Sequence, residues 1–461
     1  MRLEALHTSH CRSTILSIGV KLQSIPLPIV IFLLTLTLVI WQPRGLGIGF
    51  SALGGAVLAL ATGVVSLQDV PTVWALVWNA TFTLIALVII SLILDEAGFF
   101  RWLALLVAHG GIGRGRLLFP LVVLLGASVT ALLTNDAAVL IWTPAVMEIL
   151  LLLGFSPRGT LAFIFATGFI ADTASLPLPV SNLVNIIASD YFKISFLRYV
   201  MVMVPVNFMA IATSLGVLWF YFGRDIPPTY SLASLPPSAS AIRDPLVCKW
   251  SFAILGLLLI GYFFAPLLSI PVSVITGIGA LIMLALAGRW FHRHDSPAIE
   301  LPKVVRRAPW QVILLTLGMY LVVIGVYHAD MTALLSQYLE QLSAWGLTIA
   351  ATGTGLLATL LSGMMNNLST VLINALAIQD VTGIDPAIRE VMVYANVIGC
   401  NIGAKITPIG SLSTLLWLDL LRRKGLDIGW GQYVRMAVSL TIPVLIVSLL
   451  SLAIWLPWLI A

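Results

Sequence analysis

The sequence predicts an all-α polytopic membrane protein with two inverted repeats, each containing a re-entrant helical hairpin and a broken helix. Hydrophobic residues make up 60% of the 461 residues and charged residues only 9%, which is more apolar surface than a soluble chain can bury. Apolar runs of about 18 to 25 residues recur along the chain, and each can cross about 30 Å of hydrocarbon. Polar breaks interrupt corresponding segments of the two halves.

The first repeat is expected at residues 25–222, after an N-terminal tail at 1–24 that lacks the layout of a signal peptide. Its predicted segments are plain spans at 25–41, 46–66 and 72–94, an amphipathic stretch at 96–107, a long apolar region at 117–153, an interrupted segment at 160–188 and a plain span at 197–222. The long region carries Thr134-Asn135-Asp136 at its middle. The interruption reads DTASLPLPVSN.

The second repeat is expected at residues 250–461, after a cytoplasmic linker at 223–249. Its segments follow the same order: plain spans at 250–268, 270–287 and 310–327, an amphipathic stretch at 331–344, a long apolar region at 347–379, an interrupted segment at 391–420 and a span at 433–459. The long region carries Met365-Asn366-Asn367 at its middle, and the interruption reads NIGAKITPIGS.

Matching landmarks indicate that the two halves arose by duplication. Trp78-Asn79 corresponds to Trp310-Gln311 at an offset of 232 residues, and Asn135-Asp136 corresponds to Asn366-Asn367 at an offset of 231. Asp172 corresponds to Asn401, Pro179 to Pro408 and Asn182 to Ser411, all at an offset of 229 residues. The offset between matching residues changes by only three residues, from 232 to 229, which is hard to obtain by chance.

The two long apolar regions are interpreted as hairpins with tips at Asn135 and Asn366. Backbone at membrane depth must be paired within the protein or face a water-filled cavity. The alternative is two ordinary spans per region, for which 37 residues without a basic turn is short. Counting each hairpin as returning to its own side gives about ten full spans plus two hairpins. Each half then crosses five times, which inverts the second half.

The distribution of basic residues orients the chain. The face that collects most of them carries Arg114, Arg116, Arg158, Arg224, Arg243, Lys249, Arg289, Arg293, Lys303, Arg306, Arg307 and Arg422-Arg423-Lys424. The positive-inside rule places this face in the cytoplasm, although the basic residues of the tail then lie on the other side. The net charge of +5 therefore reports topology, and no nucleic-acid partner is expected.

Four polar elements, two hairpin tips and two helix breaks, are expected to meet at the repeat interface near the membrane midplane. The predicted substrate-binding residues are Asn135, Asn182, Asn185, Asn366, Asn367, Thr370, Asn401 and Ser411. Further polar candidates in these elements are Thr173, Ser181, Thr407 and Thr414. This set is rich in amides and hydroxyls and contains no arginine. Such groups suit a small neutral solute that both donates and accepts hydrogen bonds.

Charged groups at membrane depth cost at least about 2.5–3.5 kcal/mol each, which makes them functional candidates. Asp136, Asp172 and Lys405 are predicted to couple transport to protons, because proton binding to a carboxylate would break its pairing with the lysine. A buried ion pair that only neutralises itself is the competing interpretation. Asp95-Glu96, at the end of a span, is more typical of a solvated interfacial site.

The segments GFIADTASLPLPVSNLVNI (168–186), MVPVNF (203–208), APWQV (308–312) and VMVYANVIGCNIGAKITPIGSLSTLLWL (391–418) resemble the ArsB arsenite efflux pumps. The resemblance runs nearly without interruption from about Trp41 to the final span. It implies a member of the ion transporter superfamily in a bacterial inner membrane. It also implies export of arsenite and antimonite as neutral hydroxides, by proton antiport alone or with an ArsA-type ATPase.

No cofactor or metal is expected. Cys11, Cys248 and Cys400 offer neither a disulfide framework nor a close metal-ligand spacing, although Cys400 borders a helix break. The sequence contains no GxxxxGK[ST] loop, so we do not expect it to hydrolyse ATP. It shows no constellation typical of an intramembrane enzyme. The remaining alternatives are a cation-coupled carboxylate carrier of the same superfamily and a passive metalloid channel.

Overall fold

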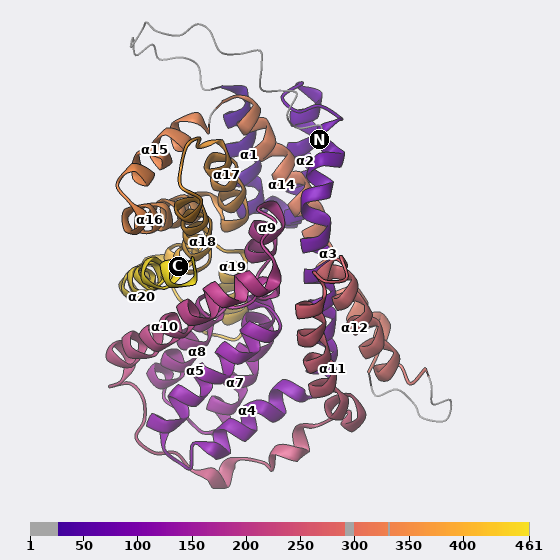
Figure 1. Ribbon diagram of the computed structural model, residues 1–461. Coiled ribbons are helices and arrows are strands. Elements are labelled where there is room, and N and C mark those ends of the chain that lie inside the picture. The colour runs from indigo at the N-terminus through magenta and orange to yellow at the C-terminus, as the bar shows by residue number, and fades with distance from the viewer. Residues whose placement is uncertain (1–25, 291–298, 331, 461) are drawn as a thin grey trace, which may run out of the picture.

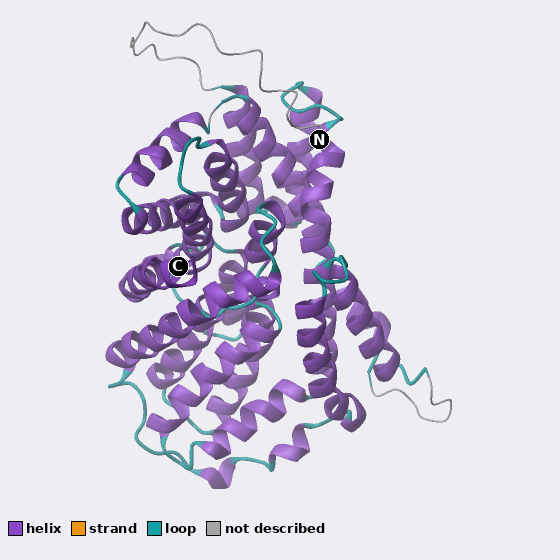
Figure 2. Cartoon of the chain, in the orientation of Figure 1, coloured by secondary structure: helices purple, strands orange, loops and turns teal. Residues whose placement is uncertain are grey.

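The computed structural model describes residues 26–290, 299–330 and 332–460. Within these ranges every regular element is a helix, and short loops join the helices (Figure 2). The predicted tail at 1–24 lies outside the described residues. Eight helical stretches are long and apolar enough to cross a membrane, and four shorter apolar helices accompany them.

The first half follows the predicted order. Its helices are α1 (Leu27–Trp41), α2 (Ile48–Ala61), α3 (Asp69–Glu96), α4 (Phe99–Gly110), α5 (Gly115–Leu132), α6 (Asn135–Ala137), α7 (Thr143–Leu152), α8 (Pro157–Thr173), α9 (Leu183–Tyr191) and α10 (Phe196–Phe222). A π-helical turn at Ala138–Trp142 joins α6 to α7, so α5 descends to the tip and α6–α7 returns from it. The predicted break separates α8 from α9.

The second half repeats this order. Its helices are α11 (Pro245–Phe264), α12 (Val272–Ala287), α13 (Leu301–Arg307), α14 (Gln311–His328), α15 (Ala333–Ala344), α16 (Leu347–Met365), α17 (Asn367–Asp380), α18 (Pro386–Ile402), α19 (Leu412–Arg423) and α20 (Trp430–Ile460). Helices α16 and α17 form the second hairpin, and the second break separates α18 from α19. The predicted fold class is confirmed.

Two features differ from the predicted segments: α13 precedes α14 where no helix was expected, and α11 starts early. Helix α11 begins at Pro245, inside the predicted linker at 223–249. The Asp244 side chain accepts hydrogen bonds from the backbone N–H groups of Leu246 and Val247, each 3.1 Å long, and proline is well placed in a first helical turn. An Asp-Pro pair is thus a helix start that hydropathy alone does not reveal. We propose 25–222 and 250–461 as the repeat units of the chain.

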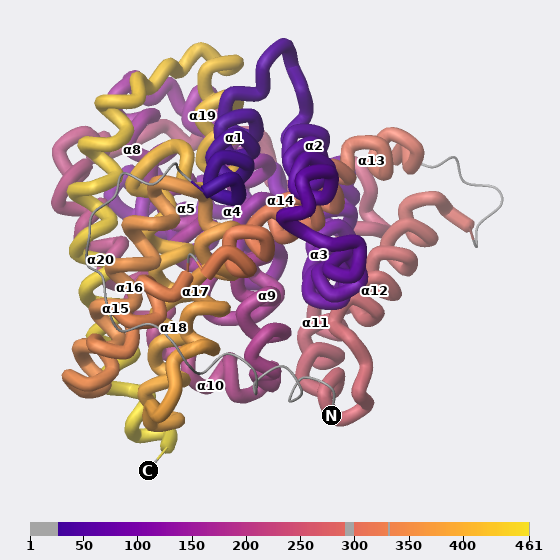
Figure 3. The backbone as a smooth tube through the Cα atoms, turned by 90° about the horizontal axis from the view of Figure 1, so that it is seen from above, coloured from indigo at the N-terminus to yellow at the C-terminus, as the bar shows by residue number. Residues whose placement is uncertain are grey.

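The helices divide into two groups (Figures 1 and 3). We call α1, α2, α3, α11, α12 and α14 the frame. The hairpins and broken helices, with α10 and α20, form the second group, which we call the carrier. Within the frame α2 packs along α14, and α12 packs along α3. These pairings exchange equivalent helices of the two halves, as expected for symmetric repeats. In Figure 1, α11 and α12 lie beside α3, on the opposite side from α5, α7 and α8.

Small residues allow the frame helices to approach closely. Gly318 of α14 lies directly against the backbone of Ala52 in α2, so that a Cβ atom at position 318 would overlap it. Helix pairs in membranes use such residues because lipid supplies no hydrophobic drive for association, and van der Waals contact must replace it. The α2–α14 pair therefore depends on glycine at this position.

We expect Gly318→Val to lower the thermal stability of the purified protein by several degrees, because the two backbones must separate. Gly256→Val in α11 is the matched control, since a Cβ atom there meets nothing within 4 Å. Unfolding in detergent, followed by fluorescence-detected size exclusion after heating, measures both. Equal losses in the two variants would contradict the close packing.

Candidate functional site

The first hairpin tip is hydrogen-bonded to both helix breaks. The Asn135 amide donates to Asp172 Oδ1 in α8 and to Ser413 Oγ in α19, each at 3.1 Å. The Ser413 hydroxyl in turn donates to Asp136 Oδ1. Because Asp172 belongs to the first repeat and Ser413 to the second, this tip lies at the repeat interface. The hairpin interpretation of 117–153 is consistent with this position, since the tip reaches the breaks at membrane depth.

The second tip turns on Asn366, whose backbone has φ 82° and ψ 145°, a strained combination that side-chain-bearing residues rarely adopt and that the surrounding contacts must hold in place. Its side-chain oxygen accepts from the N–H of Leu368 at 2.9 Å and so caps α17. The backbone N–H of Asn367 donates to the carbonyl of Gly410 in the second break at 2.9 Å. The Thr370 hydroxyl donates to the Asn366 carbonyl. This tip is therefore fixed to the break of its own repeat.

Three of the predicted asparagines hold irregular backbone in place. Asn182 caps α9 through the N–H of Val184. Asn185 donates to the carbonyls of Ser175 at 2.6 Å and Leu178 at 3.1 Å, which closes the first break. Asn401 donates to Asn185 Oδ1 at 2.7 Å and thereby joins the second break to the first. The Asn182 oxygen and the Asn185 and Asn401 amide donors are occupied in this conformation, a structural role that their positions in the sequence did not disclose.

A small cavity of about 40 Å³ opens where the tips and breaks meet. Its polar lining residues are Asn135, Asp136, Asn182, Asn367, Ser411 and Ser413. The structure thus brings five of the predicted site residues to one cavity and leaves six outside its lining, which are Asn185, Asn366, Thr370, Asn401, Asp172 and Lys405. Ser413 was missed by the sequence reasoning. The sequence feature that could have identified it is its position two residues after Ser411, in the first turn of the helix that follows the break.

The cavity retains free hydrogen-bonding capacity. The buried Ser411 hydroxyl lining it has no hydrogen-bond partner among the described residues. Buried polar atoms are normally paired with protein or water. A small hydrogen-bonding solute or water molecules would satisfy this hydroxyl, and the volume exceeds the room that a single water requires.

Lys405 is buried but is not ion-paired with a carboxylate. Its ammonium donates to the carbonyl of Phe169 at 2.7 Å and to the Thr173 hydroxyl, and lies 3.9 Å from the centroid of the Phe169 ring. These groups belong to the last two turns of α8, where the helix dipole favours a cation. All ion pairs of the described residues lie elsewhere. Lys405 and Asp172 nevertheless line one narrow cavity.

The small cavity adjoins a large one of about 800 Å³. Asp136, Val312 and Leu412 line both. The large cavity lies between the frame and the carrier and extends to Arg306 and Arg307, on the face with most basic residues. A third cavity, of about 250 Å³, includes Asn79, Asp190 and Lys193 and shares no lining residue with the small one. The site is therefore open toward the basic face.

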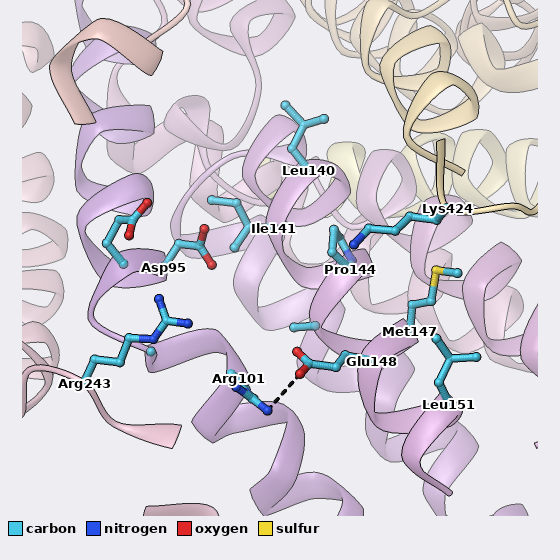
Figure 4. Close-up of a pocket in the computed structure, with 13 residues that line it drawn as sticks. Asp95, Arg101, Leu140, Ile141, Pro144, Met147, Glu148, Leu151, Arg243 and Lys424 are labelled. Carbon is cyan, nitrogen blue, oxygen red and sulfur yellow. Dashed lines mark ion pairs between the residues drawn. The ribbon is translucent and has the colours of Figure 1, made fainter. Parts of the chain in front are cut away.

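A fourth cavity, of about 420 Å³, is lined by charged side chains (Figure 4). Arg101 of α4 pairs with Glu148 of α7 at 2.8 Å, and Asp95, Arg243 and Lys424 point into the same space. Glu96 also lines it and pairs with Arg307 at 2.6 Å. No residue of a tip or a break contributes to it, so this cavity is a separate, charged pocket beside the return arm of the first hairpin.

The cysteines lie away from the candidate site. Cys400 is fully buried in α18 and its thiol faces Asn396 Oδ1 at 3.4 Å. It lines none of the cavities described above, nor does Cys248. Cys11 lies outside the described residues. Within the ranges that the structure covers, no three His, Cys, Asp or Glu side chains are placed to hold a metal ion.

The family described as arsenical pump membrane protein matches residues 27–456. The Escherichia coli protein named arsenical pump membrane protein is 54% identical over 423 residues, which covers 92% of this chain and 97% of the relative. The putative arsenical pump membrane protein of Bacillus subtilis is 28% identical over 447 residues, or 93% and 99% of the two chains. The Alcanivorax borkumensis YdaH transporter shares the fold, with a TM-score of 0.53 at 15% identity over 94% of this chain and 99% of that one.

We expect Ser413→Ala to destabilise the protein by about 1–3 kcal/mol, since it leaves Asp136 and the Asn135 amide short of a buried partner. Ser439→Ala is the matched control, because that exposed hydroxyl bonds only to the Arg435 carbonyl of its own helix. Denaturant unfolding in mixed micelles measures the difference. An unchanged midpoint for Ser413→Ala would show that the tip does not rely on this bridge.

Proposed function

The chain belongs to the arsenical pump membrane protein family, and from that premise we propose that it exports arsenite and antimonite from the cytoplasm as neutral hydroxides, coupled to proton entry. The single observation that supports this most is the small cavity between the repeats. Its polar lining consists of amides, hydroxyls and one carboxylate, beside six apolar residues, and no arginine or lysine lines it. The protein is multi-pass, and we place it in a bacterial inner membrane.

Arsenite fits the hydrogen-bonding character of this cavity. As(OH)3 carries three hydroxyl groups, each a donor and an acceptor. Asp136 accepts hydrogen bonds, the Ser411 hydroxyl is free to do both, and the Asn135 side-chain oxygen and the Asn367 amide supply further partners, since both Asn135 N–H donors are already bonded. Thiolates would hold As(III) too tightly for rapid release, and Cys400 lies outside the lining. Hydrogen bonding alone allows the solute to leave on the far side.

The open cavity supports loading from the cytoplasm. The route from the small cavity leads through the 800 Å³ space to Arg306 and Arg307, and the positive-inside rule assigns this face to the cytoplasm. We propose alternating access, in which the frame and the carrier move relative to each other and expose the site to the opposite face. This conformation is then the loading state.

Proton coupling is proposed at Asp136, Asp172 and Lys405. Asp136 is the carboxylate that lines both the small and the large cavity, so a proton and the solute reach it by one route. Protonation would remove the acceptor charge that holds Ser413, and would loosen the bridge between the tip and the second break. Asp172 and Lys405 line a neighbouring narrow cavity. We predict that they form an ion pair in the conformation open to the opposite face.

Energetically, one proton suffices. A charge that moves through 100 mV releases about 2.3 kcal/mol, whereas a tenfold gradient of a neutral solute costs about 1.4 kcal/mol. An ArsA-type ATPase partner would add a second energy source. A carboxylate carrier, the main rival, would need cationic groups for an anionic substrate, and the cationic side chains near the site point to α8 or to the cavity mouth.

Everted vesicles that contain only this protein test the proposal. With an acid interior and no ATP, we expect arsenite uptake that an uncoupler abolishes. Asp136→Asn should reduce the part of the flux driven by the pH gradient at least tenfold, because the proton-binding group is lost. Asp427→Asn, an exposed loop acid paired only with Arg422 at 3.7 Å, is the control.

Equal flux without the gradient would favour a passive channel. Flux of citrate or succinate in place of arsenite would favour the carboxylate carrier. Pumping that requires added ArsA-type ATPase and ATP would replace antiport with an obligatory partner.

A further inference from the structure

The frame and the carrier are joined on the face away from Arg306 and Arg307 by a polar contact. The Asn79 amide of α3 donates to Asp190 Oδ2 of α9 at 2.8 Å, and the Asn79 side-chain oxygen accepts from the N–H of Ser273, near the start of α12, at 3.0 Å. Asn79 is thus fixed to the frame and reaches across to the carrier. Helices α3 and α9 pack together at this point, and α9 lies beside α3 in Figure 1.

The second repeat contains the same parts in the same places. Gln311 of α14 corresponds to Asn79, and its side-chain oxygen accepts from the N–H of Gly49, near the start of α2, at 3.4 Å. The offset of 229 residues that relates the two breaks also relates Asp190 to Asp419 and Lys193 to Arg422. An amide on the frame and an acid followed by a base on the carrier are therefore present twice.

Only one of the two contacts is formed. Asp419 pairs with Arg423 of its own helix at 2.7 Å and its side chain is 46% exposed. Helices α14 and α19 do not pack together as α3 and α9 do, within the part of the chain that the structure describes. The 800 Å³ cavity lies between them, lined by Gln311 and Leu416. Asp419 lies three residues after Leu416 and so on the same side of α19.

Packing of the hairpins shows the same asymmetry. Helix α14 packs against α17, the return arm of the second hairpin, whereas α3 makes a smaller contact with the return arm of the first hairpin, at α6. The closed face is thus held by α3–α9 and α14–α17. If the two repeats exchanged their conformations, the other face would be closed instead. It would be held by contacts between α14 and α19 and between α3 and the return arm of the first hairpin.

We propose that Asn79–Asp190 and Gln311–Asp419 are two alternating gate contacts, of which one forms as the other breaks. The inference rests on the proposed alternating-access function and assigns gating residues to it. In the conformation seen here, the Asn79–Asp190 contact closes the outer face. When the carrier moves, Asp419 exchanges its exposed partner Arg423, a weak ion pair, for the Gln311 amide, and the cytoplasmic face closes.

The two gates predict effects of opposite sign. Asp190→Ala removes a hydrogen bond that stabilises the state open to the cytoplasm, and a charged hydrogen bond shifts such an equilibrium about tenfold. Asp419→Ala removes one that stabilises the state open to the outside and shifts the equilibrium by a similar factor in the other direction. Asp190→Asn keeps an acceptor for Asn79 and should restore most of the parent behaviour.

Two matched reporters measure the shift in a background with Cys11, Cys248 and Cys400 replaced by alanine. Ile48→Cys is the first residue of α2 and lines the large cavity, and Val272→Cys is the first residue of α12 and lines the outer one. A membrane-impermeant maleimide labels the first in everted vesicles and the second in right-side-out vesicles. Asp427→Ala is the control.

We expect Asp190→Ala to lower the Ile48→Cys labelling rate and raise the Val272→Cys rate, and Asp419→Ala to do the reverse. Shifts in the same direction, or no shift in either variant, would overturn the gate assignment. The labelling needs no substrate, so it stands apart from the flux assay. Absence of arsenite flux in the parent protein with opposite labelling shifts would overturn the substrate and leave the gates in place.

Discussion

The requirement that every backbone polar group be paired in the absence of water governs this structure. Hairpin tips and helix breaks place irregular backbone at membrane depth, where each unpaired group would cost several kcal/mol. Side-chain amides meet the requirement. Asn182 and Asn366 cap the helices that restart after a break or a tip, and Asn185 closes the first break from within. The amide-rich composition of the candidate site is therefore a condition of folding as well as of the binding proposed here.

That double duty explains what could be predicted from the sequence and what could not. The positions of spans, tips and breaks follow from hydropathy and from polar residues within apolar runs, and both hairpins turn at the expected asparagines. The partners of those asparagines depend on distances between segments hundreds of residues apart. Asn401 and Asn185 are hydrogen-bonded although 216 residues separate them in the sequence. No local sequence pattern predicts such a pair. Lys405, expected to pair with a carboxylate, lines a cavity with Asp172 but donates its hydrogen bonds to the Phe169 carbonyl and the Thr173 hydroxyl of α8.

The two halves carry matching residues but differ in conformation. Their equivalent frame pairs, α2–α14 and α12–α3, are both closely packed, whereas the contacts between frame and carrier are formed on one face and open on the other. Repeats with matching residues but different contacts are what a transporter with two conformations requires. Each repeat must be able to adopt the arrangement that the other repeat has in this conformation. Under the proposed alternating access, the 800 Å³ cavity and the 250 Å³ cavity on the opposite face would exchange their degrees of closure.

The cross-repeat ties around Lys405 have a mechanical consequence. Its ammonium holds the last turns of α8, and its backbone carbonyl accepts from the Tyr433 hydroxyl of α20 at 2.9 Å. Together with the Asn401–Asn185 bond, these ties join the two broken helices into one rigid piece. Such a piece cannot yield at one membrane face while it stays in place at the other. In the proposed alternating access, this rigidity would keep the two faces from opening together, so that protons could not leak through the protein along a continuous water path.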